Sequence, residues 1–359
     1  MQTAELSLII GDNSAHQNHE AGYNGIWDIT SIHDDQPLFV PQYCGMNFEF
    51  IAPKSAHDPL EPKDHPTQLL IDDAQHQVTL HQTPTPTHQV ESWMTYRTAG
   101  PTQLDWTFRY RLHDLDTFPT DVAGFFFASY IHRPENKAIY LLSRDVYDTL
   151  MWVQFCTTFQ GRDCAVTAET DAYDVQFGEF EHGLYTSRAP IRYAVPLFLG
   201  RRGDMAFVLM FENPLGVVIS HGMGGGGFVE DGSDRNPAWD FFLYTKDPAT
   251  HPEGQWKGRL VYKKFTSRDD ILIEYQNFQR SLGHDWVIPS YGSNSYSERT
   301  KFPSNRRKPS KWELNPGKPP IIGLGCIGGS IEAGETPLEA LHREAFEEIN
   351  CSITIPPHG

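Results

Sequence analysis

The sequence predicts a mainly β protein, a large antiparallel β-sandwich followed by a linker and a short α/β unit with one helix. Three observations lead to this prediction. Alternation of apolar and polar residues dominates positions 1–284. A stretch rich in Ser, Asn, Pro and basic residues, without periodicity, follows at 285–320. An apolar stripe at helical spacing lies within 321–359.

Strand-like runs fill most of positions 1–284. Residues 105–113 (DWTFRYRLH) alternate, with Trp106 and Phe108 on one face and Arg109 on the other. Turn residues separate this run from further strand-like runs at 122–131, 138–142, 152–155, 193–199, 205–211, 216–220, 239–245 and 259–265. Many strands without intervening helical periods predict a sandwich or a barrel.

The size and rhythm of residues 11–280 resemble the large β-supersandwich of the galactose-mutarotase type, which occurs in many carbohydrate-active proteins. This resemblance implies a sugar ligand, although it identifies no catalytic motif. Polar and aromatic residues gather in the first hundred positions and could line a sugar cleft: His33, Tyr43, Asn47, Glu49, His65, His88, Glu91 and Trp93. The alternative is that a chain with 16 His carries many of them in loops and on solvated strand faces.

Charge and cysteine usage restrict the partners and the compartment. A net charge of −17 argues against general nucleic-acid binding and against an anionic membrane surface. We see no apolar run of transmembrane length and no secretory signal at the N-terminus. The five cysteines are scattered and odd in number. We therefore expect reduced thiols and a cytoplasmic protein without membrane contact.

The final part of the chain carries one specific pattern, GSIEAGETPLEALHREAFEEINC at 329–351. It resembles the Nudix box of hydrolases that cleave nucleoside diphosphates linked to another group. Six residues match the family pattern without a gap: Gly329, Glu335, Arg343, Glu344, Glu347 and Glu348. Two positions depart, because Asn350 replaces the family's Gly and Cys351 replaces an aliphatic residue.

The helix that carries this pattern has clear start and packing signals. Thr336 is a good N-cap, and Pro337 is favoured at the first helical position. A stripe for packing follows at Leu338, Leu341, Ala345, Phe346 and Ile349. We therefore expect one helix over residues 337–349.

The spacing of the acidic residues predicts a metal site. Glu344, Glu347 and Glu348 stand at i, i+3 and i+4, so a helix presents their carboxylates on one face. Such a group suits Mg²⁺ or Mn²⁺, which can bridge to substrate phosphates and activate water. The resemblance implies that Glu347 and Glu344 are catalytic, while Glu335 pairs with Arg343 and stabilises the preceding loop. An ordinary solvated amphipathic helix is the structural alternative.

The Nudix-like unit is expected to be incomplete, and inactive as it stands, because only residues 352–359 follow the pattern. Two hypotheses therefore remain open. The chain is a Mg²⁺-dependent hydrolase of a nucleoside diphosphate derivative, or it is a carbohydrate-binding or carbohydrate-active β-sandwich to which the Nudix-like fragment adds nothing.

Overall fold

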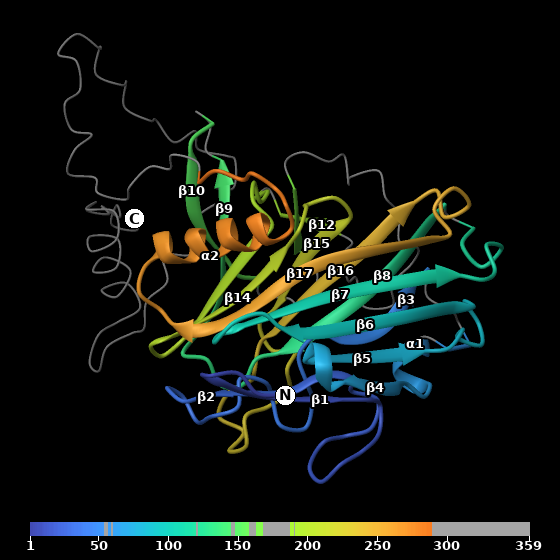
Figure 1. The fold of residues 1–359 in the computed structure, drawn as a ribbon, viewed down its shortest axis with the longest axis horizontal. Helices are drawn as coiled ribbons and strands as arrows, with labels where there is room; N and C mark the ends of the chain where they lie inside the picture. Colours follow the sequence, from blue (N-terminus) through green and yellow to red (C-terminus); the bar gives the residue numbers. More distant parts are fainter. Residues whose placement is uncertain are drawn as a thin grey trace, which may run out of the picture. The chain divides into compact units, whose positions relative to one another are not determined.

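The computed structural model describes residues 1–53, 57–58, 60–119, 121–144, 148–157, 163–167, 187–189 and 191–288. The chain divides into two compact units, Met1–Gly292 and Ser293–Gly359, and every described residue belongs to the first unit. The predicted mainly β sandwich is confirmed in this unit (Figure 1). The expected helix at 337–349, the Nudix-like unit and most of the expected linker lie outside the described residues.

The first half of the described chain is built of strands with two short helical turns. These elements are β1 (Leu6–Gly11), β2 (Gly25–Ser31), β3 (Asn47–Ala52), α1 (Glu61–Asp64), β4 (Gln68–Asp72), η1 (Asp73–Gln75), β5 (Gln77–Gln82), β6 (Val90–Thr98), β7 (Gln103–Leu112) and β8 (Val122–Tyr130).

The second half adds further strands and one longer helix. These elements are β9 (Asn136–Arg144), β10 (Leu150–Phe155), β11 (Asp163–Val166), β12 (Ser187–Arg188), β13 (Leu197–Arg202), β14 (Met205–Phe211), β15 (Val217–Gly222), β16 (Ala238–Lys246), β17 (Glu253–Lys264) and α2 (Arg268–Ser281).

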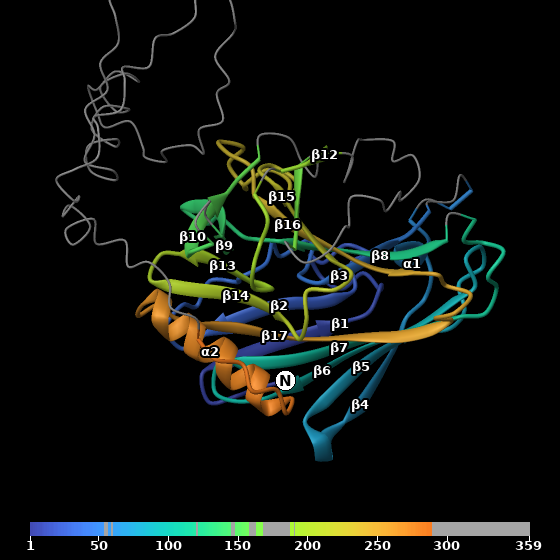
Figure 2. The same ribbon diagram turned by 90° about the horizontal axis from the view of Figure 1, so that it is seen from above.

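The strands form two large sheets and one small sheet. The nine-stranded sheet has the order β10-β9-β13-β14-β17-β7-β6-β5-β4, the six-stranded sheet has the order β12-β11-β15-β16-β8-β3, and β1 pairs with β2. Figure 2 shows the six-stranded sheet on one side of the nine-stranded sheet and α2 on the other side. Strand β17 lies between β14 and β7, so it brings together residues of three strands that are far apart in the sequence.

Aromatic side chains fill the space between the two large sheets. Phe127 of β8 lies 4.9 Å from the ring of Phe108 and 4.8 Å from that of Phe241. The predicted alternation of β7 is present, since Trp106, Phe108 and Tyr110 are buried while Arg109 is exposed. Burying each such side chain contributes roughly 1.5–3 kcal/mol relative to leaving it exposed.

Helix α2 covers the outer face of the nine-stranded sheet. Ser267 caps it by accepting a hydrogen bond from the backbone N–H of Asp270 at 3.1 Å. Its buried side chains belong to a cluster that also contains residues of β10, β13, β14 and β17. These buried apolar side chains of α2 are Ile271, Leu272, Tyr275 and Phe278.

Three expectations from the sequence need correction. A helix at 268–281 was not predicted, although Ser267 and the Ile271–Tyr275–Phe278 spacing signal one. The strand expected at 193–199 begins only at Leu197. The first residues of the expected linker pack against α2, since the Trp286 ring meets that of Tyr275 at 4.7 Å.

Two further findings concern the helices and the cysteines. Among the described residues, no helix is long and apolar enough to cross a membrane. The cysteines within the described ranges, Cys44, Cys156 and Cys164, form no disulfide.

Candidate functional site

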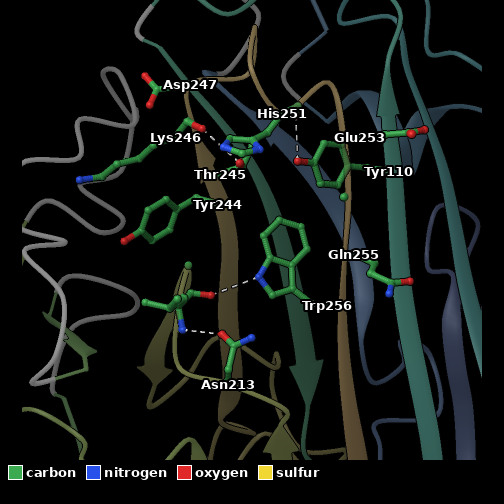
Figure 3. Close-up of a pocket in the computed structure, with 13 residues that line it drawn as sticks. Tyr110, Asn213, Tyr244, Thr245, Lys246, Asp247, His251, Glu253, Gln255 and Trp256 are labelled. Atoms are coloured by element: carbon green, nitrogen blue, oxygen red, sulfur yellow. Dashed lines mark hydrogen bonds between the residues drawn. The ribbon is translucent and has the colours of Figure 1, made fainter. Parts of the chain in front are cut away.

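A groove opens at one end of the sandwich, where β7 and β16 end and β17 begins (Figure 3). Its volume is about 540 Å³. Its wall combines aromatic rings with exposed polar side chains: Tyr110, Asn213, Leu215, Gly216, Tyr244, Thr245, Lys246, Asp247, His251, Glu253, Gly254, Gln255 and Trp256.

Trp256 is the central aromatic residue of the groove. It pairs with Phe108 across the β17–β7 ladder and stacks on Tyr110, with ring centroids 5.5 Å apart. The residues two positions away on the same face are Gly254 and Gly258. A Cβ at Gly254 would lie 2.8 Å from the Tyr110 ring, so glycine is needed there for the rings to pack over the strand. Trp256 itself stays half-buried and reaches the groove.

The loop before β15 fixes the opposite edge of the indole. The Trp256 Nε1–H donates to the carbonyl of Leu215 at 3.3 Å, and Asn213 Oδ1 accepts from the Leu215 N–H at 2.9 Å (Figure 3). Gly216 has a φ of +70°, and a Cβ there would lie 2.3 Å from the carbonyl oxygen of Tyr244. Only glycine satisfies both constraints. The ring is therefore held by the surrounding structure before any ligand arrives.

The rim of the groove is polar and carries both signs of charge. Exposed side chains on it are Lys246, Asp247, His251, Glu253 and Gln255. The Tyr110 hydroxyl donates to the His251 carbonyl at 3.2 Å. Burial raises the pKa of Tyr110, so its phenol remains a neutral donor. The groove thus offers hydrogen-bond donors and acceptors around an aromatic wall.

Two other hollows have different linings. One has a volume of about 460 Å³ and contains Arg202. The Arg202 side chain is held in an ion pair with Asp34, since its Nε lies 3.1 Å from Asp34 Oδ2, and Tyr262 donates to the same oxygen at 2.7 Å. The other, of about 420 Å³, lies on the outer face of β4 to β7. There Trp93 stacks between His81, at 5.1 Å, and Arg109, at 4.0 Å.

The structure distributes the eight residues that the sequence suggested for a sugar cleft, with five of them in the region of β3 and α1 and three at other places. Tyr43, Asn47 and Glu49 come from the β3 region. Helix α1 packs against β3, and its Lys63 lies 3.8 Å from Glu49. His65 and His88 hydrogen-bond to acids near α1, Glu91 and Trp93 lie on β6, and His33 lines the 460 Å³ hollow. The groove of Figure 3 contains none of the eight.

The groove residues Trp256 and Tyr110 were missed as functional candidates. A signal for Trp256 was present in the sequence, because Gly254, Trp256 and Gly258 alternate in one strand. Glycines flanking an aromatic residue in a strand indicate a close approach of another side chain or a ligand.

A cluster of two acidic residues and one histidine near α1 has the composition of a metal site, but its contacts explain it as a structural cluster. Asp58, Glu61 and His65 bring potential ligand atoms within 4.8 Å of one another. However, Glu61 accepts hydrogen bonds from His88 and from the backbone N–H of Thr87, and His65 Nε2 lies 2.6 Å from Asp58. These contacts hold the segment in place, and we assign no metal site to it.

The residues of the Nudix-like pattern lie outside the described residues. They are Gly329, Glu335, Arg343, Glu344, Glu347 and Glu348. Their proposed roles, and binding of Mg²⁺ or Mn²⁺, therefore stay predictions from the sequence.

Comparisons with known proteins gave no family. No family model matches the chain, and no curated protein matches it. Among solved structures it is similar to a heparinase III, the BT4657 gene product, at 8% identity and a TM-score of 0.36, covering 75% of this chain and 36% of that one. It is also similar to HI1317 at 8% identity and a TM-score of 0.37, covering 66% of this chain and 85% of that one. This chain thus spans 36% of the heparinase III chain, and neither likeness carries an argument about function.

Proposed function

We propose that this chain binds carbohydrate in the groove of Figure 3. The observation that carries the proposal is the fixed Trp256 ring, held by Tyr110 and by the Leu215 carbonyl while it lines an open groove. A pyranose has apolar C–H faces and an equatorial belt of hydroxyls. An aromatic ring can stack on the C–H faces, and a polar rim can hydrogen-bond to the hydroxyls.

The size and charge of the groove support the same class of ligand. Its volume of about 540 Å³ falls within the range of about 300–1,000 Å³ for small-molecule sites. The positive charge of Lys246 on the rim is balanced by the negative charges of Asp247 and Glu253. Glu253 also forms an ion pair with Arg111 at 3.3 Å. Such a rim favours a neutral polyhydroxylated ligand over a strongly charged one.

Isothermal titration calorimetry with neutral oligosaccharides of glucose, galactose, xylose and N-acetylglucosamine tests the proposal. We expect binding that Trp256→Phe weakens by about tenfold, because the smaller ring loses stacking area and the bond to Leu215. Trp93→Phe is the matched control, a half-buried tryptophan on the outer face of β6, and should leave the affinity unchanged. Absence of binding, or equal weakening by both substitutions, would contradict the proposal.

The sequence pattern at 329–351 favours a second function, hydrolysis of nucleoside diphosphate derivatives. In it Glu344, Glu347 and Glu348 would hold Mg²⁺, which supplies Lewis-acid activation of a phosphoryl group. The support is the sequence pattern alone. Nucleoside diphosphate sugars and dinucleoside polyphosphates with Mg²⁺ are the probes. Because the unit is expected to be incomplete, we expect turnover near background. Robust turnover that Glu347→Gln abolishes would show that the unit is active after all, and turnover independent of Mg²⁺ or of Glu347 would contradict the assignment.

A further inference from the structure

The nine-stranded sheet ends at β4, a strand with an open edge. β4 pairs with β5 on one side and, among the described residues, has no strand on its other side. Figure 2 shows it as the outermost of the neighbouring strands β7, β6, β5 and β4. An edge strand presents a row of unpaired backbone N–H and C=O groups onto which a further strand can pair. The sheet can therefore be continued at β4.

β4 lacks several features that usually protect an edge strand from pairing. Such features include Lys or Pro within the strand and a β-bulge that twists the edge away. Residues 68–72 read QLLID, with no Lys, Arg or Pro. Their pairing with β5 runs from Gln68 opposite His81 to Asp72 opposite Gln77 without a shift of register. At five residues, β4 also has the ordinary length of a strand.

The apolar side chains of β4 are exposed. Leu69, Leu70 and Ile71 are 36%, 49% and 63% exposed, respectively. The edge strands β3 and β10, in contrast, contain mostly or partly buried residues. Three successive exposed apolar residues on an unprotected edge are typical of a surface that binds another chain.

The hollow of about 420 Å³ on the outer face of the sheet begins at the same strand. Its lining includes Leu70, Ile71 and Asp72 of β4 and continues to Trp93 of β6. These side chains of β4 therefore border a hollow. A strand added beyond β4 would extend the wall of this hollow and cover the apolar residues.

The two faces of β4 present different side chains to such a strand. Leu69 and Ile71 pair with Leu80 and Val78, which are 3% and 6% exposed, so all four belong to the face that carries the core. Leu70 lies on the outer face, because side chains alternate along a strand. An added strand with apolar residues at the same three positions would bury apolar surface on both faces.

The sequence of β4 is complementary to itself when two copies run antiparallel about Leu70. Leu69 then faces Ile71 of the partner subunit, and Gln68 faces Asp72 of the partner subunit. Asp72 Oδ1 accepts the Gln75 N–H at 3.1 Å, which leaves its other oxygen for the amide of Gln68. Each carboxylate thus faces an amide donor. Parallel pairing in register would instead place two carboxylates opposite each other, which is unfavourable.

We propose that two copies of this chain associate by antiparallel pairing of their β4 strands, about a two-fold axis through Leu70. Pairing joins the two nine-stranded sheets, satisfies the edge N–H and C=O groups and buries the three apolar residues of both strands. A contact of five residues on each side is small, so the dimer is weak and depends on protein concentration. The groove of Figure 3 contains no residue of β4, so the dimer does not depend on carbohydrate binding.

Sedimentation equilibrium of the full chain over a wide range of concentrations tests this proposal. We expect a reversible equilibrium between monomer and dimer. Leu70→Lys should weaken the dimer by about tenfold or more, because it places two ammonium groups opposite each other and removes an apolar contact. Ile273→Lys is the matched control, since Ile273 is 47% exposed but lies on α2, and it should leave the equilibrium unchanged. Circular dichroism should confirm that both variants fold.

Cysteine cross-linking tests the register of the pairing. Residues directly opposite each other in antiparallel strands have Cα atoms about 4.5–5.5 Å apart, which suits a disulfide. Under mild oxidation, Leu70→Cys should therefore form a dimer through its two introduced thiols, whereas the wild type with its own cysteines should not. Gln68→Cys should form this link only when it is mixed with Asp72→Cys.

Three outcomes would overturn the inference. The first is a wild-type chain that stays monomeric at every concentration. The second is a dimer that Leu70→Lys leaves intact, because its interface would then lie elsewhere on the chain. The third is cross-linking of Gln68→Cys with itself but not of Leu70→Cys, because the strands would then not pair about Leu70.

Discussion

Asp240 of β16 and Ser220 of β15 lie directly opposite each other, and neither side chain has a hydrogen-bond partner in the part of the chain that the structure describes. Leaving a buried polar group unpaired costs about 1–3 kcal/mol. A fold that keeps two such groups side by side gives up stability at this point. That pattern is typical of functional sites, where activity and stability compete.

The pH dependence of stability should reveal the Asp240 carboxyl. Burial, reinforced by Glu49, raises its pKa well above the ordinary value of 3.8. Below about pH 4 both the folded and the unfolded chain hold this proton, so it has no effect on stability. Above that pH the unfolded chain releases the proton while the folded chain keeps it. Stability then falls by up to about 1.4 kcal/mol per pH unit until the folded-state pKa is reached.

Asp240→Asn removes this ionisation while keeping the side-chain shape. We expect the variant to match the wild type near pH 4 and to become more stable than it as the pH rises toward about 8. Urea unfolding across this range measures the difference. Parallel stability curves for the two proteins would mean that Asp240 is ionised in the folded chain.

The groove wall should be sensitive to substitution at Gly216. Gly216→Ala places a Cβ 2.3 Å from the carbonyl oxygen of Tyr244 at a residue with a φ of +70°. We expect a loss of at least about 1–3 kcal/mol in the free energy of unfolding, and weaker saccharide binding because the Leu215 carbonyl moves. Gly203→Ala is the control, since Gly203 also has a positive φ but no atom within 4 Å of its added Cβ. Equal losses in the two variants would show that the close approach to Tyr244 is unimportant.

The buried pair of Glu61 and His88 should dominate the acid sensitivity of the fold. Burial acts to raise the pKa of Glu61, but hydrogen bonds from His88 and from the Thr87 N–H outweigh it and lower the pKa below 4.5. A lowered pKa stabilises the folded chain above the unfolded value, and this contribution is lost as the pH falls through the folded-state value.

Glu61→Gln should destabilise the chain by about 1–3 kcal/mol near neutral pH, because a neutral amide oxygen replaces the carboxylate that accepts hydrogen bonds from His88 and the Thr87 N–H. It should also flatten the fall in stability below about pH 4.5. Glu91→Gln is the comparison, since Glu91 bonds His81 and His113 at a more exposed place. An unchanged acid-unfolding profile for Glu61→Gln would contradict this role.

The sequence was sufficient to predict the strands and the sandwich, because alternation such as that of β7 follows from the geometry of a half-buried strand. It was not sufficient for the sites. The groove depends on β17 lying between β14 and β7, and the position of Asp240 opposite Ser220 depends on the register of β15 and β16. Pairing between distant strands leaves no local pattern. Asp240 stands in a run of buried aromatic residues and therefore looked like part of a core strand.

The central claim, that Trp256 forms the wall of a carbohydrate site, is tested most directly by nuclear magnetic resonance of the indole N–H groups. Trp256→Phe assigns the Trp256 signal, and Trp93→Phe assigns that of Trp93. During titration with the tightest-binding oligosaccharide, the Trp256 signal should shift and saturate with the affinity measured by calorimetry, while the Trp93 signal should stay in place. A Trp256 signal that does not move during saturable binding would show that the saccharide binds elsewhere and would contradict the account.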